Sequence, residues 1–203
     1  MWVVGVLAVL LVVMGQLAWG QQRTPRRAMR MDPNVIEAMQ KSIQVEREEG
    51  QVVLYTIFRG PYEQVGEPIG KLFALAGQKG IQPAGPVTLA YLNSPWEAGP
   101  EHSLTEIRIP VSEAAMDQAG KLGDMTDVKR LRGSQVAVME KPEGIENPSW
   151  VFMIMMRWAA DEGYITPGSP RKMMQGQPMG DYASMKTRIA MPVWRPRERQ
   201  ENQ

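Results

Sequence analysis

The sequence predicts an α+β fold made of two strand-helix-strand-strand units with pseudo-two-fold symmetry, whose antiparallel sheets curve around a cleft between the repeats. Three landmarks that recur in the same order indicate the duplication. Gly50-Gln51-Val52-Val53 returns as Gly133-Ser134-Gln135-Val136, Gly85-Pro86 as Ser169-Pro170, and Ile109-Pro110-Val111 as Met191-Pro192-Val193, at offsets of 83, 84 and 82 residues. Such regular spacing is typical of a repeated structural unit. Because one helix covers only one face of a small sheet, two units are expected to pack together.

The first copy is expected over about residues 42–111 and is preceded by a helix that begins at Asp32-Pro33 and ends near Lys41, since Pro is favoured at the first helical position. Within the copy, one apolar stripe predicts a helix over Gly66–Gln78 that Gly80 terminates. Runs rich in β-formers, or alternating in polarity, predict the strands. These are Ser42–Glu48, Val52–Phe58, Pro86–Leu92 and Leu104–Val111, with a turn at Glu49-Gly50 and a loop at Asn93–Ser103.

The second copy is expected over about residues 127–193 and repeats these steps. Asn147-Pro148 predicts a helix start, Val151, Ile154, Met155 and Trp158 predict its buried stripe, and Gly163 ends it. The predicted strands are Val128–Leu131, Val136–Glu140, Arg171–Gln175 and Lys186–Val193, with a turn at Gly133-Ser134 and loops at Lys141–Glu146 and Gly176–Asp181. Each copy therefore consists of a hairpin, a helix and two further strands. Residues 32–193 are expected to form one domain, and residues 194–203 a disordered tail.

Composition limits the chemistry that is expected. The chain has 203 residues, 43% of them hydrophobic and 22% charged, which suits one globular domain. It has no Cys, which excludes disulfides and thiol catalysis, and a single His, His102. We therefore expect no cofactor, no metal site and no Ser-His-Asp triad. Sixteen Met residues supply adaptable packing of a kind that also suits accommodating binding surfaces.

Basic residues concentrate at the two ends of the chain. Residues 21–30 carry four Arg and no acid, and the tail from Trp194 carries three Arg and two Glu. Of 23 bases and 22 acids in all, residues 31–193 thus hold 23 − 7 = 16 bases and 22 − 2 = 20 acids, a net charge of −4. A nucleic-acid partner is not expected, because such binding needs a clustered basic face.

The first twenty residues are expected to be a targeting segment. Trp2–Gly15 is a continuous apolar run, and Ala18-Trp19-Gly20 places small residues at positions −3 and −1 of a cleavage site before Gln21. No base precedes the run and four Arg follow it, which instead favours a retained anchor with a cytoplasmic carboxyl side. Residues 1–20 are thus a signal peptide or a single membrane anchor, and residues 21–31 a basic linker. The protein is expected to be exported, to a periplasm or outside the cell, or anchored by this segment, which if uncleaved is its one membrane contact.

Three stretches of the first copy, Arg59–Gly66, Gly80–Pro86 and Glu106–Val111, resemble the GyrI-like small-molecule-binding domain, which also serves as the effector-binding domain of AraC-type and MerR-type transcription regulators. The second copy matches more loosely, over 127–138 and 163–170. The resemblance implies a duplicated fold with an aromatic-lined ligand cleft between the copies, often accepting bulky lipophilic compounds. Some members hydrolyse reactive small molecules. No helix-turn-helix segment fits outside the match, so no DNA-binding domain is expected.

One position departs from the family pattern. Where cation-binding or hydrolytic members have a buried Glu in a pattern like Pro-Arg-Glu-x-Tyr, this chain has Pro170-Arg171-Lys172-Met173-Met174. The resemblance therefore implies Lys172 in place of the Glu and Met174 in place of the Tyr. Two unit charges 4 Å apart interact by roughly 4 kcal/mol at an effective dielectric constant of about 20. If Lys172 faces the cleft, neutral or anionic ligands are favoured, and an enzyme is less expected than a binding protein.

The partner we expect is a small, mostly apolar, neutral or anionic molecule that the protein binds or sequesters. Candidate ligand-binding residues are Tyr55, Tyr62, Tyr91, Trp150, Trp158, Lys172 and Met174, and no catalytic residue is assigned. Core packing is the competing explanation for the aromatic side chains, above all for Trp158 on its buried helix stripe. Glu106 and Arg108, two apart on one strand, are expected to form an exposed charge pair.

Three other functions remain open. A hydrolase of an electrophilic molecule needs a carboxylate in the cleft, which Glu140 or Glu143 could supply. A haem-binding protein with the related fold of SOUL-type proteins needs His102 or a Met as axial ligand. A partner-binding module is favoured if the cleft is filled by its own side chains.

The cleavage site can be tested directly. When the full chain is produced in a Gram-negative bacterial host, we expect the mature protein in the periplasmic fraction with Gln21 as its first residue, because the small residues at −3 and −1 suit signal peptidase. Intact-mass measurement of the purified protein reads this out. A full-length mass in the membrane fraction would instead identify residues 1–20 as an anchor.

Overall fold

The computed structural model describes residues 31–196, except 124, 144, 146–147 and 176–185. Contacts within the chain separate residues 1–32 from a unit formed by Pro33–Gln203, and the fold below belongs to that unit. The expected targeting segment 1–20, nearly all of the linker 21–31 and the loop Gly176–Asp181 lie outside the described residues. In the described part of the chain, no helix combines the length and apolar character needed to cross a membrane.

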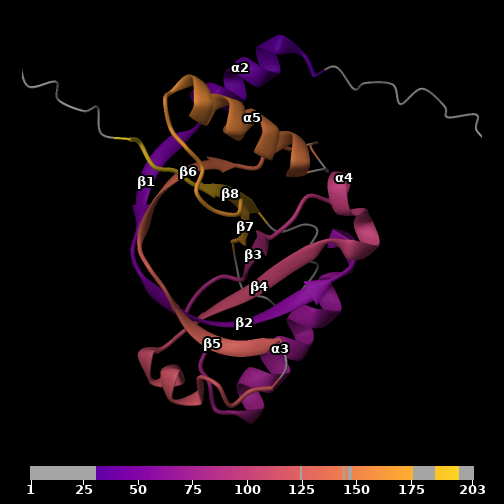
Figure 1. The fold of residues 1–203 in the computed structure, drawn as a ribbon, viewed down its shortest axis with the longest axis vertical. Coiled ribbons are helices and arrows are strands. Elements are labelled where there is room, and N and C mark those ends of the chain that lie inside the picture. The colour runs from indigo at the N-terminus through magenta and orange to yellow at the C-terminus, as the bar shows by residue number, and fades with distance from the viewer. Residues whose placement is uncertain (1–30, 124, 144, 146–147, 176–185, 197–203) are drawn as a thin grey trace, which may run out of the picture. The chain divides into compact units, whose positions relative to one another are not determined.

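Eight strands form a single antiparallel sheet in the order β1-β6-β8-β7-β3-β4-β2-β5 (Figure 1). The strands of the first copy are β1 Gln44–Glu48, β2 Gln51–Arg59, β3 Thr88–Tyr91 and β4 Leu104–Val111. Those of the second copy are β5 Thr126–Leu131, β6 Ser134–Glu140, β7 Arg171–Met174 and β8 Thr187–Pro192. The α+β class and all eight expected strands are confirmed.

The strand order has the symmetry that the duplicated landmarks predict. Exchanging β1 with β5, β2 with β6, β3 with β7 and β4 with β8 reverses the order and leaves it otherwise unchanged. The two copies join through β3 and β7, where Leu89 lies opposite Lys172. One continuous sheet therefore runs through both copies, with the pseudo-two-fold axis between its central strands.

The expected hairpins are wrong. β1 pairs with β6 and β2 with β5, so consecutive strands of one copy pair with strands of the other instead of with each other. Figure 1 shows the β1–β2 segment sweeping from one end of the sheet to the other. Sequence patterns identify strands but not their partners, and a short Gly-containing link suits a crossing as well as a turn.

Gly50 and Gly133, the landmarks read as turns, lie where the two crossing segments pass each other. A Cβ on Gly133 would lie 2.7 Å from the Glu48 carbonyl oxygen, and one on Gly50 would lie 3.0 Å from the Leu131 carbonyl oxygen. Contacts below 3.0 Å are not tolerated by close-packed atoms. Glycine is required here because the two backbones approach so closely, and this explains why it recurs in both copies.

Two longer helices cover one face of the sheet. α3, Gly66–Gln78, lies against β2 and buries Ile69, Leu72 and Ala76, while α5, Pro148–Asp161, lies against β8. A further helix, α2, Pro33–Lys41, packs on α5. The expected boundaries of α3 match the structure, and Gly80 and Gly163 adopt the left-handed conformation (φ 68° and 73°) that ends α3 and α5.

The register assigns side chains to two faces of the sheet. We call the helix-covered face, which carries Leu54, Leu89 and Ile189, the outer face. We call the other the inner face; it carries Tyr55, Glu106, Arg108, Lys129, Arg171 and Arg188. Although no α-helix of the described residues packs there, Val53, Val136 and Ala190 on the inner face are all buried to 0% exposure, because the sheet curls around them.

The remaining differences from the expected elements are local. The loop Asn93–Ser103 contains two short helices, α4 Pro95–Ala98 and η2 Pro100–His102, and further single turns lie at η1 Tyr62–Gln64 and η3 Glu113–Gln118. Trp194 exchanges two backbone hydrogen bonds with Ile165, so ordered pairing extends one residue into the segment expected to be disordered. Residues 197–203 lie outside the described part.

Replacing Gly133 by Ala tests the crossing. We expect Gly133→Ala to lower the free energy of unfolding by about 1–3 kcal/mol, because the new methyl group meets backbone that cannot yield. Gly77→Ala is the matched control: its Cβ meets nothing within 4 Å on α3, so helix propensity should raise stability by about 0.5–1 kcal/mol. Denaturant titration measures both, and equal effects of the two substitutions would contradict the crossing constraint.

Candidate functional site

A cavity of about 710 Å³ lies on the outer face where the two copies meet. The first copy contributes Tyr62 of η1, Tyr91 at the end of β3 and residues 92–94 that follow it. The second copy contributes one side of α5 and the loop Thr166–Pro170, which leads into β7. Because β3 and β7 are the paired central strands, the seam of the duplication brings these segments together.

Three aromatic rings form a continuous cluster in the cavity wall. The ring centroids of Tyr62 and Tyr91 are 4.5 Å apart and those of Tyr91 and Phe152 are 5.2 Å apart, both pairs in tilted geometry. Rings at such separations attract each other through their quadrupoles in addition to burying area. The cluster spans both copies, so it also holds α5 against the first copy.

Hydrogen bonds fix the loop after β3. The Tyr62 hydroxyl donates to the Asn93 carbonyl oxygen at 2.9 Å. The Asn93 side chain accepts from the Leu104 backbone N–H at 2.7 Å and donates to the His102 carbonyl oxygen at 3.0 Å. Burial raises the pKa of the Tyr62 hydroxyl, so it remains a neutral donor. This rim of the cavity is therefore pre-formed.

The side of α5 that lines the cavity carries Ser149, Phe152, Met153 and Met156, spaced i, i+3, i+4 and i+7 along one helix face. Phe152 is buried, whereas Met153 and Met156 are 45% and 53% exposed and lie at the mouth. These residues were not predicted from the sequence, because the buried stripe of the helix was the only pattern considered there. The apolar residues Phe152, Met153 and Met156, beside that stripe, were the signal that could have found them.

Of the seven predicted ligand-binding residues, the structure places Tyr62 and Tyr91 in the cavity wall. Trp150 and Trp158 are on α5 but are not among the described lining residues. Trp158 stacks on Tyr164 with ring centroids 5.7 Å apart. The Arg195 guanidinium carbon lies 4.4 Å from the centroid of the Tyr164 ring. Trp158 is therefore half-buried in a stack with Tyr164, neither on the fully buried stripe that was expected nor in the described lining.

Tyr55 and Met174 also lie away from the cavity wall. Tyr55 is on the inner face, where the Lys129 ammonium lies 4.1 Å from its ring centroid. Met174 is on the outer face but is only 2% exposed. It occupies the place in β7 that Tyr91 occupies in β3, since Leu89 and Lys172 face each other across the axis.

Lys172 is on the outer face, between Leu89 and Ile189, and is half-buried. It is not among the described residues that line the cavity. Burial lowers the pKa of its ammonium group, and the nearby charge of Lys141 lowers it further. Lys172 lies two residues along β7 from Pro170 in the cavity wall, about 7 Å at the usual rise per residue of a strand.

The described lining residues include no charged side chain. Within the described residues, no cluster of three or more His, Asp or Glu side chains could hold a metal ion. An apolar, aromatic wall with a few hydroxyl and amide groups at its rim is typical of a site for a small organic molecule.

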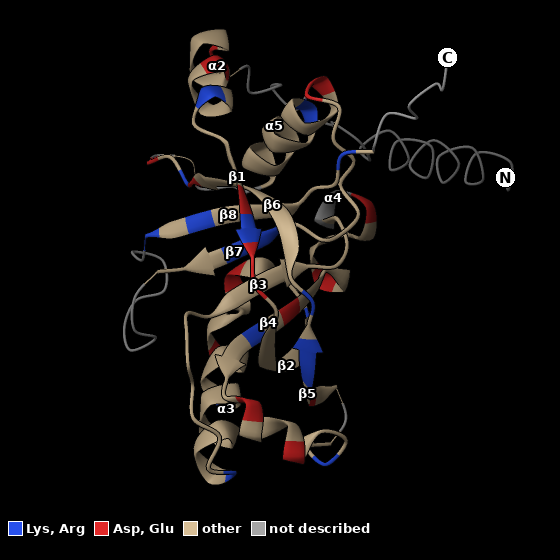
Figure 2. Ribbon diagram, turned by 90° about the vertical axis from the view of Figure 1, so that its left-hand side faces the viewer, with Lys and Arg blue, Asp and Glu red and all other residues tan. Residues whose placement is uncertain are grey.

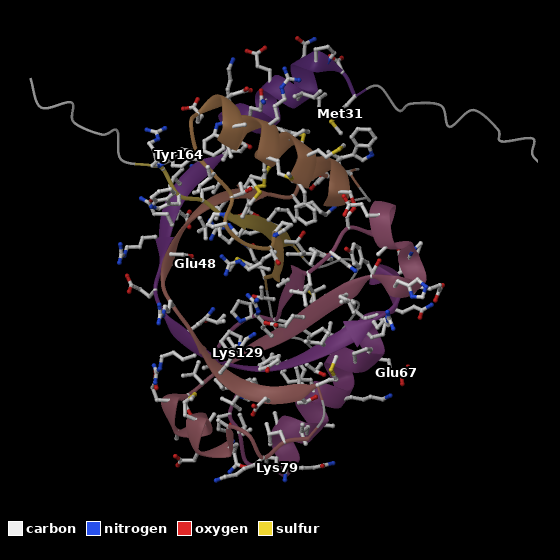
Figure 3. All side chains as sticks on the ribbon, viewed as in Figure 1. Met31, Glu48, Glu67, Lys79, Lys129 and Tyr164 are labelled. Atoms are coloured by element: carbon white, nitrogen blue, oxygen red, sulfur yellow. The ribbon has the colours of Figure 1, made fainter. Side chains whose placement is uncertain are left out.

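The register places charged side chains of several strands on the inner face. Figure 2 shows charged residues along these strands, and Figure 3 labels two of them, Glu48 and Lys129. Glu106 is only 5% exposed and accepts from Arg108 Nε at 2.6 Å and pairs with Lys129 Nζ at 2.8 Å. The expected pairing of Glu106 with Arg108 is present, but its expected exposure is wrong, because the curl of the sheet buries this face. Burial alone would raise the pKa of the Glu106 carboxyl, but Lys129 and Arg108 hold it below its usual value.

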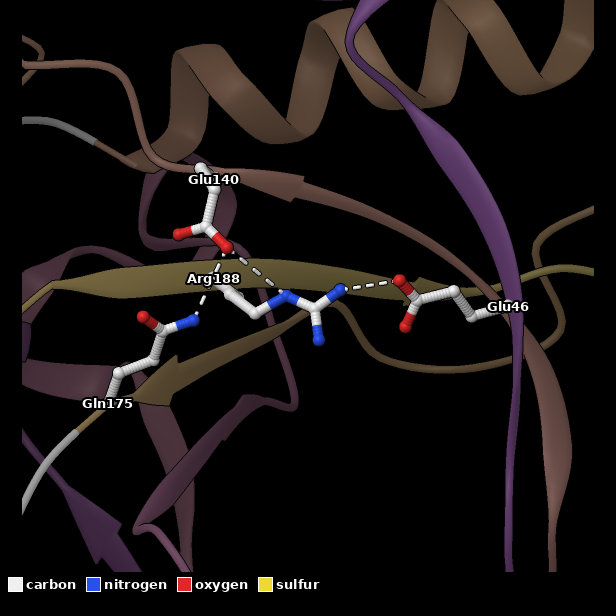
Figure 4. A network of polar contacts seen from close by, with 4 residues as sticks. All are labelled: Glu46, Glu140, Gln175 and Arg188. Carbon is white, nitrogen blue, oxygen red and sulfur yellow. Dashed lines mark hydrogen bonds and ion pairs between the residues drawn. The ribbon is translucent and has the colours of Figure 1, made fainter.

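Similar ion pairs on the same face tie β1 of the first copy to strands of the second copy. Arg171, 8% exposed, lies 2.9 Å from Glu48. Figure 4 shows Arg188 between Glu46, at 2.7 Å, and Glu140, at 3.4 Å, with Gln175 donating to Glu140. Each cation in this network has an anionic partner on β1, β4 or β6.

No protein-family model matches the sequence, and no curated protein matches it. Solved structures do. The crystal structure of the EcmrR C-terminal domain superposes with a TM-score of 0.59 at 17% identity, covering 76% of this chain and 98% of that one. A second structure, EcmrR bound to DNA, gives 0.61 at 15% identity over 92% and 70%. A crystal structure described as a hydrolase from Listeria innocua gives 0.51 at 13% identity over 74% and 92%. The GyrI-like fold expected from the sequence is thereby confirmed.

The pKa of Glu106 gives a pH-dependent prediction. A carboxyl whose pKa is depressed by folding stabilises the protein above its unfolded pKa, about 4.3, and loses that contribution as pH falls through the folded pKa. Glu106→Gln leaves Arg108 and Lys129 without their shared anion, so we expect it to cost about 1–3 kcal/mol at pH 7 and much less at pH 3. Denaturant titration at both pH values measures the difference.

Glu113→Gln is the control for this experiment, since Glu113 pairs with Arg130 on the exposed surface and should change stability little at either pH. A cost for Glu106→Gln that does not vary between pH 7 and pH 3 would show that the carboxylate charge is not the stabilising element.

Proposed function

We propose that this protein binds or sequesters a small, mostly apolar molecule, neutral or anionic, in the cavity between its two copies. The observation that carries the proposal is the cluster of Tyr62, Tyr91 and Phe152 in a wall without charged side chains among the described lining residues. A volume of about 710 Å³ falls within the range of ligand pockets, about 300–1,000 Å³. Apolar surface and aromatic faces bind varied ligands by burial and with little loss of side-chain entropy.

The preference about ligand charge follows from Lys172. Lys172 lies two residues from Pro170 in the cavity wall, about 7 Å along an extended chain. This separation is shorter than the Debye length at physiological ionic strength, about 8 Å, so salt does not fully screen the Lys172 charge at the wall. Partial burial reduces screening further. A cationic ligand would be opposed by this charge with no carboxylate in the described lining to compensate it, whereas a neutral or anionic ligand would not.

The solved structures of similar fold bear on function in a general way. They are the C-terminal domain of EcmrR, EcmrR in complex with DNA, and a protein from Listeria innocua that is described as a hydrolase. Hydrolysis needs a carboxylate near the ligand, but Glu140 lies on the inner face with Arg188, and Glu143 is exposed and outside the described lining. Of the axial ligands named for the haem-binding alternative, His102 is exposed on η2 and is not among the described lining residues, whereas the Met residues Met153 and Met156 are. A binding protein fits these positions best.

We also propose that binding takes place outside the cytoplasm or at a membrane surface. The apolar run Trp2–Gly15 followed by Ala18-Trp19-Gly20 supports this location. A domain of this kind would then meet its ligand before the ligand enters the cell, or as the ligand leaves it.

A charge at the mouth of the cavity tests the site. We expect Met156→Asp to weaken binding of Nile red (neutral) and of 1-anilinonaphthalene-8-sulfonate (anionic) at least about tenfold, because a hydrated carboxylate replaces apolar contact area. Tetraphenylphosphonium (cationic) is expected to bind the unmodified protein more weakly than either. Fluorescence titration and native mass spectrometry measure these affinities.

Met125→Asp is the matched control. Met125 is 58% exposed, lies outside the described lining and has a positive φ of 61° that Asp tolerates. Equal loss of binding in both variants would place the ligand elsewhere, and a preference for the cation would overturn the charge argument.

A further inference from the structure

The hydroxyl of Tyr91 is a buried polar group in the cavity wall that makes no hydrogen bond with a described residue. Tyr91 is 6% exposed and lines the cavity, and its ring is held between Tyr62 and Phe152. Its backbone N–H donates to the Pro170 carbonyl oxygen, but its hydroxyl makes no hydrogen bond with any described residue. Buried polar groups in folded proteins are nearly always hydrogen-bonded, so an exception requires an explanation.

The unused hydroxyl faces space rather than packed atoms. Polar side-chain atoms of the described residues that are both fully enclosed and without a hydrogen bond occur only in Thr105, Arg171 and Thr187. The Tyr91 hydroxyl also makes no hydrogen bond with a described residue, yet its oxygen is not in that group, so it retains contact with open volume. The open volume beside Tyr91 is the cavity it lines.

The chemistry of this hydroxyl differs from that of its neighbour. Burial, with smaller contributions from Tyr62 and Glu63, raises the pKa of Tyr91 far above its ordinary value, so the group keeps its proton at any physiological pH. Tyr62 already donates its hydroxyl proton to the Asn93 carbonyl oxygen. Tyr91 is therefore a buried hydrogen-bond donor that is available to a ligand. The neighbouring Tyr62 oxygen can only accept, because its proton is already donated to Asn93.

Resting on the ligand-binding function proposed above, we infer that the cavity selects molecules that carry a hydrogen-bond acceptor, such as a carbonyl or ether oxygen, on a flat apolar frame, and that the Tyr91 hydroxyl donates to this acceptor. The tilted rings of Tyr62 and Phe152 flank the donor on two sides and leave apolar surface around it. A ligand without an acceptor would fill the same volume but leave the buried donor unpaired. A site built around a donor discriminates against analogues that lack the acceptor more sharply than an apolar pocket discriminates by size.

The test uses two probes of nearly equal shape. 9-Fluorenone carries a carbonyl where fluorene carries a methylene group. We expect the unmodified protein to bind fluorenone roughly 3- to 10-fold more tightly than fluorene, and Tyr91→Phe to abolish this preference by weakening fluorenone alone, in line with the worth of one neutral hydrogen bond. Fluorescence titration gives both affinities.

A second measurement separates recognition from structure. Because the Tyr91 hydroxyl makes no hydrogen bond within the described part of the chain, Tyr91→Phe should melt at the same temperature as the unmodified protein, or higher, without ligand. Tyr55→Phe is the matched control: it removes a tyrosine hydroxyl from the inner face, away from the described cavity lining, and should keep the fluorenone preference.

The outcomes distinguish this inference from the function on which it rests. If both probes bind with equal affinity in the unmodified protein and in Tyr91→Phe, the cavity is a ligand site but the donor role is wrong. If neither probe binds while Nile red does, the flat carbonyl class is wrong. If no apolar probe binds at all, both the inference and the proposed function fail.

Discussion

The structure depends on the close crossing of two backbone segments at Gly50 and Gly133. With no Cβ at either position, the chain leaving β1 and the chain leaving β5 pass within contact distance. Each chain then continues into the opposite half of the sheet. Each copy therefore supplies an edge strand to the other, and neither copy has a complete sheet by itself. The two halves are tied by backbone pairing at both edges and at β3–β7, so the segments that line the cavity are held by the whole sheet.

The two faces of this sheet carry different chemistry for a physical reason. The outer face is covered by α3 and α5, and its side chains are apolar wherever the helices pack. The inner face is enclosed only by the curl of the sheet, and its carboxylates and bases neutralise one another across strands, as Glu106 does with Arg108 and Lys129. The charged network thus lies on the face opposite the cavity, Lys172 is a charged residue on the outer face, and the described lining beside the aromatic cluster is uncharged.

The site arises because the copies have diverged within a conserved framework. Gly85 packs on the ring of Pro110 as Gly168 packs on Pro192, with a Cβ at each glycine 3.1 Å from the proline ring, so the framework is shared. Tyr91 of the first copy, by contrast, corresponds to the buried Met174 of the second, and only the former has a hydroxyl. The cavity is therefore an asymmetric feature placed near a pseudo-symmetry axis, where both copies contribute surface but one contributes the polar group.

The sequence by itself determined the helices and strands and the residues at which they end. Side-chain periodicity predicts the alternating strands and the apolar stripe of α3, formed by Ile69, Leu72 and Ala76. Backbone preference predicts that Gly80 ends this helix. Both are local properties that depend on residues close together in the sequence. The repeated landmarks predicted two related halves, and the cleft residues Tyr62 and Tyr91 were named from the first of them. These predictions needed no knowledge of which strand pairs with which.

Only the tertiary structure decided the partners. The exchange of β1 and β5 depends on pairing between residues 70 (Thr56 with Thr126) to 94 (Gln44 with Val138) positions apart. The burial of Glu106 and the position of Lys172 beside the cavity, outside its described lining, depend on how the whole sheet assembles. Periodicity assigns a residue to one side of a strand, but it does not say which side will be enclosed when the sheet curls. The same limit explains why Phe152, Met153 and Met156 were missed: a helix has two apolar borders, and the fold alone determines which of them meets a cavity.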